Sequence, residues 1–89
     1  MAEPPEINPH DELRIGSRKA VACTVYGLGR IEVVYLDDRD RAINEDVVWR
    51  DYKWRFEHSA PVGGYADKHD RLQAFVTQLR HSHHYPLKT

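Results

Sequence analysis

Short runs of valine, isoleucine, tyrosine, tryptophan and threonine recur between Arg18 and Phe56, and small Gly or Asp clusters interrupt them. This pattern is typical of consecutive antiparallel strands, because β-branched and aromatic side chains fit a pleated, half-buried surface. The connections are as short as hairpin turns, so neighbouring strands should pair in a meander. We expect four strands, at about residues 19–26, 30–37, 42–49 and 53–57, and a segment at residues 13–15 is a candidate short edge strand.

The second expected strand is apolar on both of its faces. Ile31, Val33 and Tyr35 share one side, and Val34 and Leu36 lie on the other. Since side chains alternate across a strand, both faces of the sheet need to be covered at this position. The face with Val34 and Leu36 is therefore either a packing surface for a helix or the interface of a homodimer.

The last expected hairpin is defined by a two-residue turn at residues 51–52. That turn would place Trp49 opposite Trp54, and it would leave Val48 opposite Arg55 on the outer face. We therefore expect a tryptophan pair across the final two strands.

A C-terminal helix is predicted over about residues 67–81. Asp67 is a candidate N-cap, and Arg80 suits the negative end of the helix dipole. The apolar positions follow a 3.6-residue period, which gives the helix one stripe that can cover the sheet. The stripe residues are Leu72, Phe75, Val76 and Leu79.

The chain is long enough for one domain and no more, at 89 residues. Proline-rich residues 1–12 are expected to form a flexible arm, residues 13–82 the globular domain and residues 83–89 a flexible tail. The predicted fold class is α+β: a bent four-stranded antiparallel meander, SH3-like and possibly a partial barrel, with one C-terminal helix packed on it.

Composition and charge narrow the range of functions. The chain carries 13 Lys+Arg against 14 Asp+Glu, a formal net charge of −1, which gives no bulk attraction to nucleic acid or to an anionic membrane. Its single cysteine, Cys23, excludes an intramolecular disulfide and a cysteine-based zinc site. The N-terminal residues lack the pattern of a signal peptide, and no apolar run is long enough for a membrane span, so we expect a cytoplasmic protein.

Candidate catalytic and metal-binding residues are few and incomplete. Glu45 interrupts the apolar side of the third strand; it is either a buried carboxylate or is turned outward by a bulge at residues 44–45. His81 and His84 would lie one helical turn apart and could bind a metal weakly. Because no sequence neighbour completes either site, we expect no enzyme and no cofactor.

Surface recognition has more support. Arginine beside tyrosine or tryptophan is typical of binding hot spots, both for proteins and for nucleic acids. The chain places such residues on the turn after the first strand and on the last hairpin. The candidate partner-binding residues are Tyr26, Arg30, Trp49, Tyr52, Trp54 and Arg55.

The stretch from Ile15-Gly16-Ser17 to Val25-Tyr26-Gly27-Leu28-Gly29-Arg30 and Val34 resembles the opening of SH3-like or Tudor-like small barrels. It is similar in particular to CarD-type and transcription-repair-coupling-factor modules that bind RNA polymerase. The resemblance implies a non-enzymatic protein-interaction module, an accessory factor of bacterial transcription machinery. The alternatives are a nucleic-acid-binding small barrel and, least favoured, a small metal-binding protein or enzyme.

Overall fold

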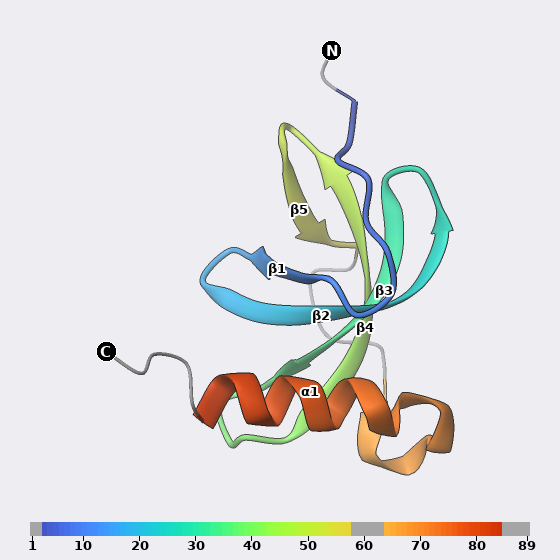
Figure 1. The fold of residues 1–89 in the computed structure, drawn as a ribbon. Helices are drawn as coiled ribbons and strands as arrows, with labels where there is room; N and C mark the ends of the chain where they lie inside the picture. Colours follow the sequence, from blue (N-terminus) through green and yellow to red (C-terminus); the bar gives the residue numbers. More distant parts are fainter. Residues whose placement is uncertain (1–2, 58–63, 85–89) are drawn as a thin grey trace.

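The computed structural model describes residues 3–57 and 64–84, which form one antiparallel sheet and one C-terminal helix (Figure 1). The five strands are ordered along the sheet as they are along the chain. They are β1 (Glu12–Ile15), β2 (Arg18–Gly27), β3 (Arg30–Leu36), β4 (Ala42–Arg50) and β5 (Lys53–Phe56). Two 3-10 turns, η1 (Ala66–Lys68) and η2 (Asp70–Leu72), then lead into α1 (Gln73–His84).

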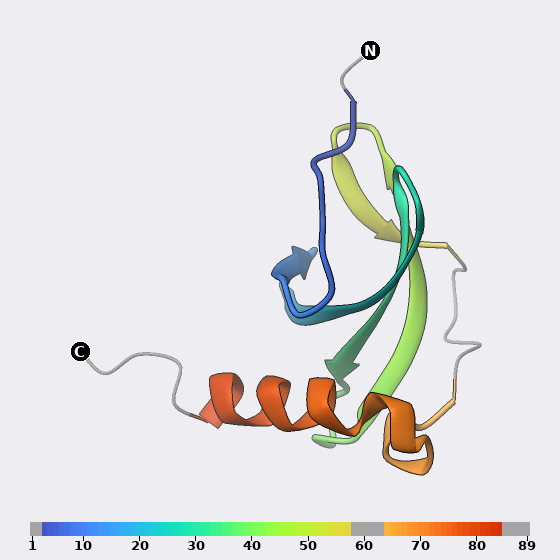
Figure 2. The ribbon, with the colours of Figure 1, turned by 45° about the vertical axis from the view of Figure 1, so that its right-hand side comes forward.

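The sheet is strongly curled into a half-barrel, and α1 packs on its convex side (Figures 1 and 2). This confirms the predicted α+β meander with a packed helix, although the sheet has five strands rather than four. The additional strand is β1, which extends the candidate edge segment at residues 13–15 by one residue. No ladder joins β1 to β5 among the described residues, so the sheet remains a half-barrel.

Two irregularities in β2 accompany the curl. The ladder with β3 shifts register between Ala22 and Thr24, and again between Val25 and Gly27. An extra residue in one strand bends that strand and increases its twist, so these bulges let β2 follow the curved sheet. As a result, the far end of β2 and the start of β3 project as a hairpin at the end of the half-barrel away from α1 (Figure 1).

Each face of the sheet carries its own apolar core. On the concave side the centre is formed by Ile31, Val33 and Val47, all of which are fully buried. On the convex side Val21 and Val34 are buried against α1. The stripe predicted for the helix is confirmed, because Leu72, Val76 and Leu79 are buried in this second core and Phe75 packs at its margin.

The α-helix begins later than predicted, at Gln73 rather than near Asp67. His69 has an extended backbone, with φ −117° and ψ 115°, and this separates η1 from η2 and prevents one continuous helix. Asp67 is not an N-cap in this arrangement. Its carboxylate instead accepts a hydrogen bond from Arg80, at 3.2 Å, and so ties η1 to α1.

The segment before β1 contacts the half-barrel, although its composition suggested a flexible arm. The amide of His10 donates to the carbonyl of Ala22, and the amide of Ala22 donates to the carbonyl of Asp11, both at 2.8 Å. Ile7 packs against the concave core. Residues 7–11 therefore make specific contacts with the domain.

The last hairpin has the predicted register. Trp49 lies opposite Trp54, and Val48 lies opposite Arg55. Both turn residues have positive φ, 56° at Asp51 and 67° at Tyr52, as in a type I′ turn. The second position of such a turn favours glycine, because a side chain there meets the following carbonyl oxygen. Tyr52 is therefore in a strained conformation.

We expect Tyr52→Gly to raise the free energy of unfolding by about 1 kcal/mol, since it removes the left-handed strain. The Tyr52 side chain is 70% exposed, so its loss removes little packing. Urea denaturation of both proteins gives the difference. Tyr52→Ala is the matched control, because it removes the same ring and keeps the Cβ; equal stability of the two variants would contradict this explanation.

Candidate functional site

The six predicted partner-binding residues do not lie on one surface, because the strands place them on opposite faces of the sheet. Trp49 and Trp54 belong to the concave core, where their rings meet edge to face with centroids 5.4 Å apart. Trp54 is only 7% exposed. The tryptophan pair thus lines the inside of the half-barrel rather than its outer surface.

Tyr26 and Arg30 lie together on the β2–β3 hairpin. The guanidinium carbon of Arg30 is 5.5 Å from the ring centroid of Tyr26, at cation–π distance. The same guanidinium forms ion pairs with Glu57 at 3.2 Å and with Asp46 at 3.7 Å, and the Tyr26 hydroxyl donates to Asp46 at 3.3 Å. This group is therefore a partly neutralised polar cluster beside an exposed ring.

Arg55 and Tyr52 belong to the β4–β5 hairpin. Arg55 pairs with Asp51 at 3.7 Å and donates to the carbonyl of Arg50 at 3.2 Å. These contacts fold its side chain back onto its own hairpin. Tyr52, in contrast, projects at the turn and is largely exposed.

The face that contains Val34 and Leu36 is covered by this chain's own helix. Both residues are buried, and they pack in the cluster that includes Val76 and Leu79 of α1. A homodimer is therefore not needed to cover them.

Exposed apolar side chains gather at one end of the molecule. Four of the five large hydrophobic residues that the structure leaves exposed are on the β2–β3 and β4–β5 hairpins. Both hairpins project at the end opposite α1, and the N-terminal segment runs beside them (Figures 1 and 2). We call this surface the hairpin end; its exposed apolar residues are Val25, Tyr26, Leu28 and Tyr52.

A cavity of about 320 Å³ lies at the hairpin end. Residues 5–9 of the N-terminal segment form one wall, and the β2–β3 hairpin forms another. Ile31 and Trp54 connect the cavity to the concave core. The hairpin end thus combines exposed apolar side chains with a hollow in the sheet, which is how ligand-binding and partner-binding sites are commonly built.

Sequence analysis missed Glu32, which is the most heavily bonded carboxylate on the convex face. Its side chain is 4% exposed, and Arg71 of η2 contacts both of its oxygens at 2.9 Å in a bidentate ion pair. Thr24 donates to one oxygen at 2.9 Å, and Asn44 donates to the other at 3.1 Å. The ion pair joins the middle of β3 to the start of the helical segment.

Burial and hydrogen bonding have opposite effects on the pKa of Glu32. Burial favours the neutral acid, but the hydrogen bonds from Arg71, Thr24 and Asn44 and the charge of Arg71 outweigh it, so the net pKa of Glu32 is lowered. The group is therefore an ionised structural anchor at neutral pH. The other amide atom of Asn44, Oδ1, is buried without a hydrogen-bond partner among the described residues.

Glu45, the other carboxylate considered, is buried rather than turned outward. It is 2% exposed and pairs with Val33 in a β3–β4 ladder that shows no shift of register. The bulge considered at residues 44–45 is therefore absent from β4. Glu45 faces the concave side, where its charge contributes to raising the pKa of Tyr35 after the larger effect of burial.

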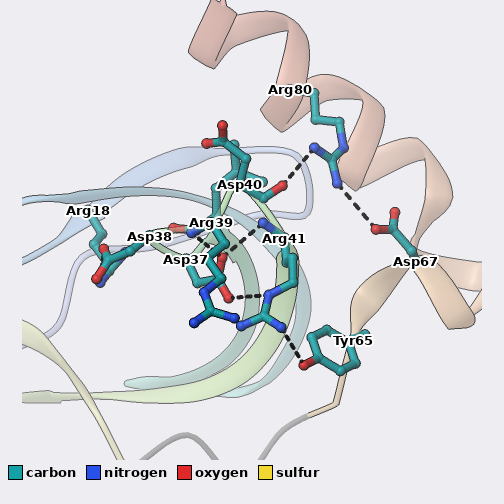
Figure 3. Close-up of polar contacts among 10 residues, drawn as sticks. Arg18, Asp37, Asp38, Arg39, Asp40, Arg41, Tyr65, Asp67 and Arg80 are labelled. Carbon is teal, nitrogen blue, oxygen red and sulfur yellow. Dashed lines mark hydrogen bonds and ion pairs between the residues drawn. The ribbon is translucent and has the colours of Figure 1, made fainter.

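The acidic turn between β3 and β4 is organised by its own arginines (Figure 3). One oxygen of Asp37 accepts the amides of Arg39 and Arg41, and the other accepts the Arg41 side chain at 2.9 Å. Arg41 also donates to the hydroxyl of Tyr65, and Arg80 donates to the carbonyl of Asp40, each at 3.0 Å. These contacts tie the turn to the helical segment.

Metal binding by the terminal histidines stays a prediction, because the side chain of His84 lies outside the described residues. Within the described part of the chain, no three His, Cys, Asp or Glu side chains are grouped so that they could hold a metal ion. Of the helices described, none has the length and hydropathy of a membrane span.

No protein-family model matches this chain, and neither the comparison with curated proteins nor that with solved structures finds a match. Its function therefore has to be inferred from its own residues.

Cys23 is placed where it should be chemically inert. It is 5% exposed beneath α1, and burial, reinforced by the charge of Glu32, raises the pKa of its thiol to about 12. Because the thiolate is the reactive form, we expect an aromatic disulfide reagent at pH 8 to modify Cys23 only after denaturation in urea. Stoichiometric modification of the native protein within minutes would contradict the buried position.

We expect Arg71→Met to lower the free energy of unfolding at pH 7 by about 2 kcal/mol, because Glu32 loses a bidentate charged partner while it stays buried. In the wild type the lowered pKa of Glu32 stabilises the fold above the ordinary pKa of 4.5, and this is lost as pH falls through the folded-state pKa. In the variant, burial should instead raise that pKa.

The difference in the free energy of unfolding between wild type and Arg71→Met should therefore shrink as pH falls below about 5. Urea denaturation at pH 4 and pH 7 measures this difference. Arg71→Lys is the matched control, since it keeps the charge but not the bidentate geometry and should lose less stability than Arg71→Met. A loss of stability in Arg71→Met that is the same at both pH values would rule out the ion pair as its cause.

Proposed function

We propose that this chain is a non-enzymatic protein-interaction module whose partner binds at the hairpin end. The observation that carries this proposal is that four of the five exposed large hydrophobic residues lie on two hairpins at one end of the molecule, where Val25 and Leu28 line a cavity. Single exposed hydrophobic residues are ordinary, whereas several of them beside an open cavity are typical of an interaction surface.

The conformation of Tyr52 supports the same surface. An exposed aromatic ring at a left-handed turn position costs folding free energy and contributes little to packing. Strained residues persist most often where they serve a function. A tyrosine held at the tip of a hairpin is also a common anchor in protein interfaces.

The net charge of the chain, −1, favours a protein over a nucleic acid, because phosphate binding depends on an excess of cations. Two arginines near the hairpin end are also neutralised, since Arg30 is paired with Asp46 and Glu57, and Arg55 with Asp51. Arg50 and Lys53 beside the β4–β5 turn are exposed and have no ion pair among the described residues, so they are the cations that a nucleic acid would have to use. The nucleic-acid alternative is therefore less well supported.

The resemblance to RNA-polymerase-binding modules suggests a more specific partner. Two glycines of the resembling stretch, Gly16 and Gly29, have positive φ, 65° and 84°, so their backbone conformations suit glycine. We propose bacterial transcription machinery in the cytoplasm as the first place to look for the partner. This specific role rests on the resemblance alone.

The experiment is site-specific photocrosslinking in cells. A photoreactive phenylalanine analogue replaces Leu28 at the hairpin end or, as the matched control, Ala74 on the exposed side of α1. We expect a nuclease-resistant protein adduct from position 28 that is absent from position 74 and is lost when Tyr52→Ala is added. Equal adducts from both positions, or none from position 28, would contradict the proposal.

A further inference from the structure

The N-terminal segment occupies the open side of the half-barrel at the hairpin end. In Figure 1 it runs down past the two hairpins, and Figure 2 shows that it lies to one side of both before it joins β1. Ile7 is half-buried against the concave core, and residues 5–9 line the cavity that reaches Trp54. The segment thus forms a wall of this cavity and covers the part of the concave core beside it. We call the surface of the half-barrel that residues 3–7 cover the groove; their departure would join it to the cavity.

Pro4 is seated closely on the start of β3. A Cβ built on Gly29 would lie 3.2 Å from Cγ of Pro4 and 3.7 Å from Cβ of Trp49. Glycine at position 29 therefore lets a proline ring approach the backbone beside the tryptophan pair. The contact of this half-buried proline ring with Gly29 is apolar and needs no hydrogen bond.

The segment is attached firmly at one end and loosely at the other. Asn8 and Asp11 close a turn in which the Asp11 amide donates to the Asn8 carbonyl at 3.0 Å, and Pro9 and His10 are its central residues. His10 stacks on Phe75 of α1 with centroids 4.3 Å apart, and the Gln78 amide donates to the His10 carbonyl at 2.8 Å. This turn fixes residues 8–11 to the domain.

Residues 3–7, in contrast, are held by apolar contact. Among the described residues, none of their backbone groups hydrogen-bonds to the half-barrel. Two of the five are prolines, and a proline has no amide hydrogen to donate. The loose part can therefore leave the groove without breaking a hydrogen bond, with the Asn8–Asp11 turn as its fixed end.

We propose that residues 3–7 are an internal stand-in for the ligand, and that the groove binds an extended, proline-containing apolar segment of a partner protein. The chemistry of the occupant is given by the residues that already fill the groove: a proline ring on Gly29 and a branched aliphatic side chain on the concave core. This inference rests on the proposed function and specifies the partner's binding segment.

The stand-in also regulates binding. A groove that its own chain fills nine-tenths of the time has a tenth of its intrinsic affinity for a ligand, because only the open fraction can bind. Release of residues 3–7 should therefore strengthen ligand binding about tenfold.

The test uses the full-length chain and a synthetic peptide with the sequence of residues 3–9. The release variants are Ile7→Ser and, in case the first is destabilised, Pro4→Ser; Asp70→Asn, at an exposed position of η2 outside the groove, is the control. Binding is followed by NMR from the indole N–H signals of Trp49 and Trp54. A second peptide carries serine in place of isoleucine.

We expect both release variants to bind the first peptide about tenfold more tightly than wild type or Asp70→Asn, and to bind the serine peptide far less. Folded release variants that bind no more tightly than wild type would overturn the inference. So would release variants that form dimers and bind no peptide, since the groove would then take a second copy of the chain.

The two proposals fail separately. If the release variants bind the peptide but position 28 gives no crosslinked partner in cells, the groove inference stands and the proposed function falls. If position 28 gives a specific adduct but the peptide never binds, the interaction surface stands and this account of its ligand falls.

Discussion

Strand β3 is buried on both faces along six consecutive residues, from Ile31 to Leu36, and the rest of the fold serves to cover it. A strand that is apolar on both faces is stable only where both faces of its sheet are covered. Here the concave face is covered by curling the neighbouring strands around it, and the convex face is covered by α1. The curl of the sheet and the packing of α1 thus both serve to bury β3.

The same requirement explains the Glu32–Arg71 pair. Glu32 follows directly on the concave residue Ile31, and alternation places it on the convex face in line with Val34. There the helical segment passes above it, and a buried carboxylate is tolerated only with partners. Arg71 supplies two hydrogen bonds from η2, and this interaction fixes where the helical segment crosses the sheet.

Much of the architecture could be predicted because it depends on local patterns. The β4–β5 register follows from turn length and alternation, and the stripe on α1 follows from helical period. The late start of α1 could not be predicted in this way. Asp67 is a good N-cap by composition, and it is the extended backbone at His69 that separates η1 from η2 and α1.

The site was harder to predict, because it depends on contacts between distant residues. Glu32 and Arg71 are 39 positions apart, and nothing in either local pattern indicates their pairing. The tryptophans were expected to contribute to a surface, but alternation with the curl of the sheet turns them inward. The proline-rich composition of residues 1–12 also suggested a flexible arm. Composition does not reveal the apolar contacts of this segment, because proline removes a hydrogen-bond donor but can still pack against apolar groups.

Polar contacts and purely apolar contacts are concentrated at opposite ends of this small domain. Ion pairs and hydrogen bonds fasten the helical segment to the sheet at one end. They are made by Arg71 and, as Figure 3 shows, by Arg41 and Arg80. At the hairpin end, residues 3–7 of the N-terminal segment are held by proline and isoleucine contacts, with no backbone hydrogen bond to the half-barrel among the described residues. Regions that move in binding come from the less stable part of a protein, because a partner must replace the contacts it displaces. The helix end thus maintains the fold, which leaves the hairpin end free to exchange its apolar contacts for those of a partner.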